Sequence, residues 1–192
     1  MSAQAEEPEH SNAQAGHKSP SAAGRPFWQT KTLAQMSESE WESLCDGCGK
    51  CCCFRLEEWD NLPGKTHGRV HITDVACRLL DRETARCSDY ADRKRHVPDC
   101  VKITPDSVGG LYWLPRTCGY RLVSEGRDLP DWHPLRSGRA ESVGEAGMSV
   151  AGLTVAEDSV HESDHPSRIT IWPGEEGSEE GSEEGSEDAN EE

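Results

Sequence analysis

The sequence contains few of the residues that usually fill a protein core. Leucine, isoleucine, valine and phenylalanine make up only 28 of the 192 residues, a low proportion that is typical of chains that do not fold. This shortage excludes a large apolar core. The sequence also lacks any run approaching the roughly 20 apolar residues that cross a bilayer, so we expect no transmembrane helix and no membrane partner.

The sequence also lacks a secretory signal, and its number of cysteines is odd. The N-terminus has no basic segment followed by an apolar stretch, and the nine cysteines include three in a row, Cys51 to Cys53. Neighbouring Cα atoms lie about 3.8 Å apart, which is shorter than the usual disulfide range of about 4.4–6.8 Å. We therefore expect free thiols in a reducing cytoplasm rather than a disulfide framework.

The two ends of the chain differ from its middle. Residues 1–25 are rich in small and polar residues, and residues 173–192 hold ten acids and no base, mostly as repeats of Glu-Glu-Gly-Ser. Such segments cannot bury enough apolar surface to offset their ordering entropy. We expect a disordered segment at 1–25, a cysteine-cluster metal-binding domain at 26–155, and a low-complexity, acidic disordered tail at 156–192. The tail is either a solubilising segment or a surface for a protein partner.

Charge is distributed unevenly. The formal net charge is −16, yet the window from Cys45 to Arg121 holds 13 bases against 11 acids and all nine cysteines. Local cations stabilise thiolates, so this window favours a lowered thiol pKa. Its positive charge is too small to indicate a nucleic-acid-binding module.

Local patterns predict short helices and few strands. Ser37 and Glu40 have the spacing of a capping box, which predicts a helix at about 38–45. The other expected elements are a short strand at 69–72, a helix from Thr73 or Asp74 to Leu80 that carries Cys77, and a helix from Pro115 to Glu125. We therefore expect a small, irregular, mainly-α domain that is stabilised by metal and flanked by disordered termini.

The chemistry is concentrated in the sequence Cys45-Asp46-Gly47-Cys48-Gly49-Lys50-Cys51-Cys52. Glycines between the cysteines allow the backbone to wrap closely around one centre, and soft thiolates bind zinc, Cu(I) or iron–sulfur clusters. Two separated C-x-x-C pairs are usual for zinc, whereas a continuous run is closer to the spacing of bacterial iron–sulfur proteins. The run therefore predicts a metal site and leaves both metals open.

Further candidate ligands lie downstream. Four more cysteines could complete two four-thiolate centres or one binuclear centre, or only some of them could ligate: Cys77, Cys87, Cys100 and Cys118. The ninth, Cys53, is expected to be a bystander. Four histidines near the cysteines are weaker candidates for ligands, namely His67, His71, His96 and His133. The other four lie in polar flanks and are expected to be solvated: His10, His17, His161 and His165.

The order of these features resembles the YcgN-like CxxCxxCC cysteine-cluster family, described as zinc- or iron-chelating proteins. The matching stretches include Pro26-Phe27-Trp28-Gln29, Trp41 to Gly49, Cys51-Cys52, Val75-Ala76-Cys77-Arg78, Cys87, Pro98-Asp99-Cys100, Trp113-Leu114-Pro115, Thr117-Cys118, Tyr120-Arg121-Leu122 and Trp132-His133-Pro134-Leu135. The resemblance covers about residues 26–155; Cys53, residues 57–68 and the tail depart from it. It implies that the metal ligands are Cys45, Cys48, Cys51, Cys52, Cys77, Cys87, Cys100 and Cys118.

The sequence thus predicts an intracellular protein that chelates zinc or iron, with an iron–sulfur redox protein or enzyme using the same cysteines as the alternative. A phosphate-binding glycine loop, a nucleophile elbow and a His-Glu-x-x-His motif are all missing, so enzyme status stays open. Structural zinc can supply about 10–16 kcal/mol, which matches the whole net stability of about 5–15 kcal/mol of a typical domain.

Overall fold

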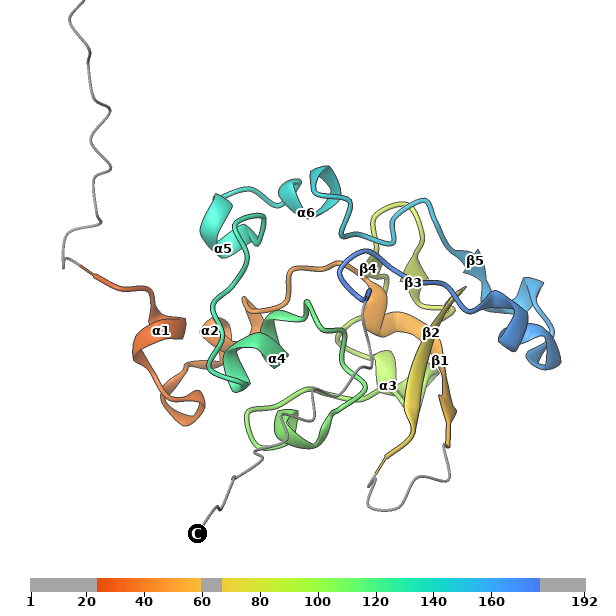
Figure 1. Cartoon of the computed structure of the whole chain (residues 1–192), viewed down its shortest axis with the longest axis horizontal. Coiled ribbons are helices and arrows are strands. Elements are labelled where there is room, and N and C mark those ends of the chain that lie inside the picture. The colour runs from red at the N-terminus through yellow and green to blue at the C-terminus, as the bar shows by residue number, and fades with distance from the viewer. Residues whose placement is uncertain (1–23, 60–66, 177–192) are drawn as a thin grey trace, which may run out of the picture.

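The structure of the protein is a computed structural model that describes residues 24–59 and 67–176. Short helices and strands follow one another along the chain (Figure 1). The α-helices are α1 (Phe27–Thr30), α2 (Glu38–Glu42), α3 (Arg93–His96), α4 (Gly119–Ser124), α5 (Pro134–Ser137) and α6 (Ser142–Glu145). The strands are β1 (Cys53–Glu58), β2 (Arg69–Ala76), β3 (Leu80–Asp81), β4 (Arg86–Cys87) and β5 (Val155–Ala156). The 3-10 helices are η1 (Leu33–Gln35), η2 (Lys50–Cys52), η3 (Val108–Gly110), η4 (Glu157–Ser159) and η5 (Glu162–Arg168).

The expectation of a mainly-α domain is wrong. Every α-helix in the described ranges has four to six residues, whereas β1 has six and β2 has eight. The α-helices are short because turn-forming residues bound them closely. Pro134 begins α5, for example, and Gly138, with φ of +72°, ends it after four residues.

The longest strand replaces a helix that the sequence suggested. The strand expected at 69–72 is confirmed, but it continues to Ala76, so the helix predicted from Thr73 or Asp74 to Leu80 is wrong. Val70, Ile72, Thr73 and Val75 are β-branched, and such side chains pack well on a pleated sheet.

The strands form two small sheets. In the first, β1 pairs antiparallel with β2, and β5 joins the other edge of β2 in parallel through Val75 and Ala76. In the second, β3 pairs antiparallel with β4, with Leu80 opposite Cys87. Within the described part of the chain, no helix is long and apolar enough to cross a membrane.

Two predicted helices are present in shorter form. The Ser37 hydroxyl accepts the Glu40 N–H, and the Glu40 carboxylate accepts the Ser37 N–H, so the predicted capping box is confirmed and α2 follows it. The helix expected from Pro115 to Glu125 begins only at Gly119, after a turn closed by a hydrogen bond from Cys118 N to Pro115 O.

Two apolar clusters lie on either side of the cysteine motif. The first gathers buried side chains of α2, α4 and their connections: Trp41, Leu44, Val108, Leu114, Cys118, Tyr120, Leu122, Val123 and Leu129. The second lies against the sheets and contains Cys53, Ala76, Leu80, Ala85, Val150 and Trp172. The motif runs from Leu44 in the first cluster to Cys53 in the second, so its loop joins the two halves of the core.

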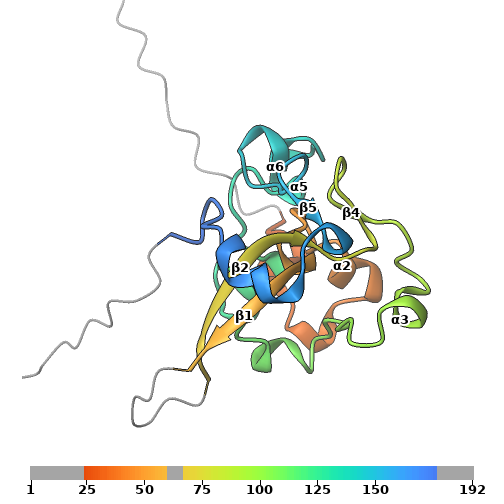
Figure 2. The same ribbon diagram turned by 90° about the vertical axis from the view of Figure 1, so that its right-hand side faces the viewer.

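The folded part extends beyond the boundary expected at residue 155. η5 lies against β1 and β2 (Figure 2), and Thr170 donates its N–H to Ile72 O. Trp172 is buried, and its indole N–H donates to Thr73 O at 3.3 Å. His165, expected to be solvated, is buried with its ring 5.1 Å from that of Phe54. The expected disorder of residues 1–23 and of the acidic repeat after Glu176 falls outside the described residues.

Candidate metal-binding site

The cysteine motif forms a tight loop between α2 and β1. Gly47 and Gly49 have φ values of +74° and +80°, which L side chains rarely adopt. A Cβ atom at Gly47 would lie 1.7 Å from Arg86 Nη1, and one at Gly49 would lie 2.6 Å from a Val150 methyl group. The left-handed backbone favours glycine at both positions, and at Gly49 close packing against Val150 excludes a side chain as well.

Three cysteines of the motif lie near Cys118, at the start of α4. The Leu44 carbonyl oxygen would be only 2.1 Å from a Cβ atom at Gly119, so the backbone before Cys45 touches the backbone after Cys118. Charge on Cys51 is a further cause, after burial, of the raised pKa of Cys45, Cys48 and Cys118. We call this set the first group: Cys45, Cys48, Cys51 and Cys118.

Three of the other four predicted ligands, Cys52, Cys77 and Cys87, lie around the start of the β3–β4 pair. Cys77 N donates to Cys52 O at 2.9 Å, and Cys77 O accepts from Leu80, the residue paired with Cys87. Burial is the main cause that raises the pKa of Cys77, and charges on Cys100 and Cys87 add to it. This is the second group: Cys52, Cys77, Cys87 and Cys100. We use the two groups as a hypothesis for how the eight cysteines share the ligation, which the sequence leaves open.

The two groups meet at consecutive residues. A side-chain hydrogen bond with Cys52 is the largest cause of the raised pKa of Cys51. Arg55 lies beside this junction, because its Nη1 donates to Cys51 O at 2.7 Å and its guanidinium sits 3.8 Å above the Trp113 ring. Charges on Cys51, Cys52 and Cys100 act on Arg55, so one cation faces both groups.

The thiols of the first group are harder to ionise than the basic window suggested, because the pKa of each is raised. Desolvation raises the pKa of Cys118 to about 12, and it does the same for Cys45, which is exposed over part of its surface. Burial likewise holds the pKa of Cys48 well above its ordinary value. The expectation of lowered pKa values is wrong because the loss of water outweighs nearby cations such as Arg86.

Asp46 is a buried acid in the middle of the first group. Only 4% of its surface is exposed; Oδ1 accepts the Cys48 N–H at 2.9 Å, and Oδ2 has no hydrogen-bond partner among the described residues. The negative charge of Asp46 contributes to the raised pKa of Cys45, Cys48 and Cys118. Sequence reasoning passed over this residue, although its position directly after the first cysteine was a usable signal.

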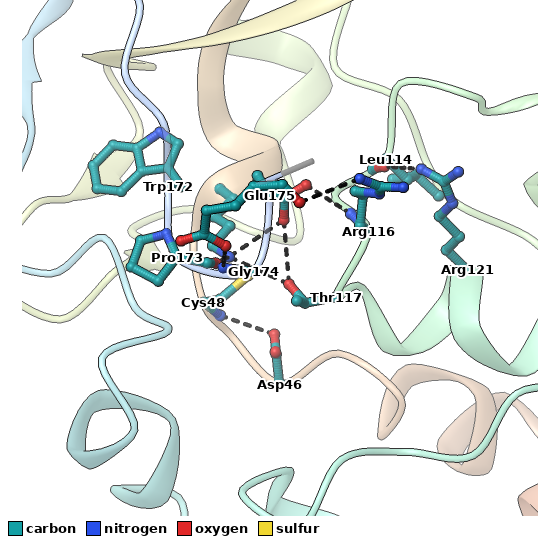
Figure 3. A network of polar contacts seen from close by, with 12 residues as sticks. Asp46, Cys48, Leu114, Arg116, Thr117, Arg121, Trp172, Pro173, Gly174 and Glu175 are labelled. Carbon is teal, nitrogen blue, oxygen red and sulfur yellow. Dashed lines mark hydrogen bonds and ion pairs between the residues drawn. The ribbon is translucent and has the colours of Figure 1, made fainter. Parts of the chain in front are cut away.

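Lys50 is also buried inside the motif, and the C-terminal segment neutralises it. Its side chain is fully inaccessible, and Nζ lies 3.3 Å from Glu175 Oε1 and 3.3 Å from Thr117 Oγ1. Nζ also donates to the Pro173 carbonyl oxygen. Arg116 N donates to Glu175 Oε2 at 2.8 Å. Figure 3 labels Arg116, Thr117, Pro173 and Glu175 of this network, which ties residues 173–175 to the cysteine loop.

The four candidate histidines contact groups other than the cysteines. His133 is fully buried, its Nε2 lies 3.2 Å from Leu44 O, and its Nδ1 accepts the Leu135 N–H, so both ring nitrogens hold the backbone. The other three also contact side chains outside the two groups: His67 stacks on Tyr112, His71 pairs with Glu58, and His96 pairs with Asp89.

Cys53 belongs to the second apolar cluster, and its Sγ donates to Gly49 O at 3.9 Å. All nine cysteines are free thiols. Within residues 24–59 and 67–176, no three His, Cys, Asp or Glu side chains are arranged around one point as the ligands of a metal ion would be. The donor set nevertheless fits zinc or iron in its chemistry, because soft sulfur atoms predominate and the Asp46 Oδ2 atom beside them has no hydrogen-bond partner in the described part of the chain.

Comparison with known proteins identifies the family. A family model described as "CxxCxxCC: Putative zinc- or iron-chelating domain" matches residues 44–119. A UPF0260 protein of Sinorhizobium fredii is 53% identical over 152 residues, which are 79% of this chain and 94% of the relative. The chain belongs to the UPF0260 family. UPF0260 proteins of Parvibaculum lavamentivorans and Rhizobium meliloti are 53% and 52% identical, cover 79% of this chain, and are themselves covered to 95% and 94%.

The family model spans every predicted ligand of this UPF0260 chain, since Cys45 and Cys118 are the first and last of them. Glu175, which holds Lys50, lies outside the matched residues. No solved structure matches the chain.

Proposed function

We propose that this UPF0260 protein chelates zinc or iron through the thiolates of the first and second groups. The observation that supports the proposal is that the fold brings distant cysteines of the chain together: Cys77 N donates to Cys52 O at 2.9 Å, and the Leu44 carbonyl oxygen, next to Cys45, lies against Gly119, next to Cys118. A chain with so few branched apolar residues gains from such a site, because thiolate–metal bonds supply folding free energy that its core lacks.

Positive side chains close to the loop would offset the negative charge of a thiolate–metal site. Four thiolates around one divalent ion leave a net charge of −2, so positive side chains are needed close to the site. Arg55 faces both groups, and the guanidinium of Arg86 packs against Gly47 and lies 3.5 Å from Asp46 O. These two arginines would offset the charge of the loaded site.

Loading couples metal binding to proton release and to side-chain movement. Thiols with raised pKa values keep their protons until a metal displaces them. We propose that binding turns the thiols of each group towards a shared ion, while the backbone, held by Gly47, Gly49 and the Leu44–Gly119 contact, stays as it is.

Metal analysis after anaerobic purification tests the proposal. The proposal predicts stoichiometric zinc in a colourless protein, or iron in a coloured one. Acid-labile sulfide together with iron would identify an iron–sulfur cluster as the bound form. If neither metal copurifies under reducing conditions and neither binds on addition, the proposed function is refuted.

Two buried cysteines provide a matched pair of variants. Cys48 and Cys53 are 6% and 3% exposed, so serine at either position removes a buried sulfur atom of the same kind. We predict that Cys48→Ser loses metal and compactness, whereas Cys53→Ser retains both. Metal content is measured by elemental analysis and compactness by gel filtration. Equal metal content in Cys48→Ser and the wild type would contradict the assignment of Cys48.

A further inference from the structure

The carboxylate of Asp46 is buried with one oxygen unpaired. Oδ1 is used in a local turn, where it accepts the Cys48 N–H at 2.9 Å, but Oδ2 is inaccessible and has no partner among the described residues. A buried carboxylate oxygen without a hydrogen bond or a cation is costly, because water solvates it well in the unfolded chain. Turn formation does not account for this cost, since the turn uses only Oδ1.

Two cations lie near Asp46, and its Oδ2 atom accepts a hydrogen bond from neither of them. Lys50 is neutralised by Glu175, and Arg86 Nη2 lies 3.5 Å from the main-chain oxygen of Asp46 rather than from its carboxylate. Thiols are among the side chains near the Asp46 carboxylate, and its charge contributes to the raised pKa of Cys45, Cys48 and Cys118. An acid surrounded by thiols is unfavourable in the metal-free protein and becomes favourable when a cation lies between them.

We infer that Asp46 is an oxygen ligand of the metal ion bound by the first group. The inference rests on the proposed function and changes its ligand set: the carboxylate takes the place of one of the four thiolates, which keeps the site four-coordinate and its net charge at −2. The unpaired Oδ2 atom then supplies the bond to the ion, while Oδ1 keeps the turn. A mixed set of thiolates and one carboxylate suits zinc and iron and is poorly suited to Cu(I), which prefers sulfur alone.

The test compares D46N with a matched control. Asparagine keeps an oxygen for the Cys48 N–H and replaces the carboxylate oxygen that would bind metal. D81N is the control, because the Asp81 carboxylate makes a similar turn by accepting the Glu83 and Thr84 N–H groups, is exposed, and lies on β3, outside the first group. Affinity for Zn²⁺ is measured by competition with a chromophoric chelator, and the visible spectrum of bound Co²⁺ reports the ligand set.

We expect D46N to weaken Zn²⁺ binding by roughly tenfold or more and to shift the Co²⁺ d–d bands, whereas D81N matches the wild type in both. The metal-free D46N protein should melt at a higher temperature than the metal-free wild type, because the unpaired buried charge is gone. This higher melting temperature also shows that D46N folds.

Zn²⁺ affinity within twofold of the wild type, with an unchanged Co²⁺ spectrum, would overturn the inference and leave the proposed function intact. If the wild type bound neither Zn²⁺ nor Co²⁺, the proposed function would fail, and the inference with it. The two failures are therefore distinguishable.

Discussion

Replacing Glu175 with glutamine leaves the ammonium of Lys50 buried without its counter-ion. The Lys50 side chain is fully inaccessible, and Glu175 is the acid that the structure places against it, at 3.3 Å. The Glu175 side chain is itself 14% exposed. The pair is therefore unequal: an unpaired Glu175 could still be solvated, but an unpaired Lys50 could not.

The size of the effect follows from this geometry. Removing one partner of a buried ion pair costs about 3–5 kcal/mol. Two features reduce the cost here: glutamine keeps an oxygen near Nζ, and Lys50 retains the Pro173 carbonyl and the Thr117 hydroxyl as acceptors. We therefore expect E175Q to lower the free energy of unfolding by about 2–3 kcal/mol.

A second variant isolates the charge. K50M removes the buried ammonium, and apolar replacements of buried ion pairs are often close to neutral. The double variant K50M/E175Q should therefore be more stable than E175Q, with a coupling of about 1–2 kcal/mol between the two sites. E145Q is the exposed control, because Glu145 pairs with Arg139 at the surface and should cost at most about 0.5 kcal/mol.

Urea unfolding of the reduced protein, followed by tryptophan fluorescence, measures these differences, and Trp172 adjoins Pro173 in the affected segment. The reasoning is refuted if E175Q and E145Q lose equal stability, or if the double variant loses the sum of the two single losses. Either result would mean that Lys50 does not depend on Glu175 as its counter-ion.

Two further predictions concern the first group. The apparent affinity for Zn²⁺ should rise with pH between 6 and 8, by up to tenfold per pH unit for each displaced proton. Burial raises the pKa of Cys45 and Cys118 to about 12, so the ion must replace protons on both thiols. Chelator competition at several pH values checks this, and a constant affinity would contradict it. G119A should lower the free energy of unfolding by about 1–3 kcal/mol, because its Cβ atom would clash with Leu44 O. G144A is the control and should cost no stability, because a Cβ atom at Gly144 meets open space. Equal melting temperatures of the two variants in thermal unfolding would contradict the close approach of Gly119 to Leu44.

Local chemistry made part of the fold predictable. The capping box of Ser37 and Glu40 acts within four residues, and α2 begins where it indicates. β2 was only partly foreseen, because its pairing with β1 and β5 decides between helix and strand after Thr73. Trp172 could not be placed from the sequence, since its polar surroundings resemble a tail and its partner, Thr73 O, lies 99 residues away.

The candidate site was likewise only partly predictable from the sequence. The motif identified which side chains carry sulfur, but the grouping of Cys52 with Cys77, Cys87 and Cys100 depends on the contact of η2 with the end of β2. The direction of the thiol pKa values also required the structure, because burial, which composition does not report, outweighs the local charge.

The account depends most on sulfur ligation of a metal by this chain, and X-ray absorption at the metal edge of the anaerobically purified protein measures it directly. We predict a first shell dominated by sulfur, with zinc–sulfur distances of about 2.3 Å if the metal is zinc. A metal with only oxygen and nitrogen neighbours, or a reduced protein that binds no metal at all, would contradict it.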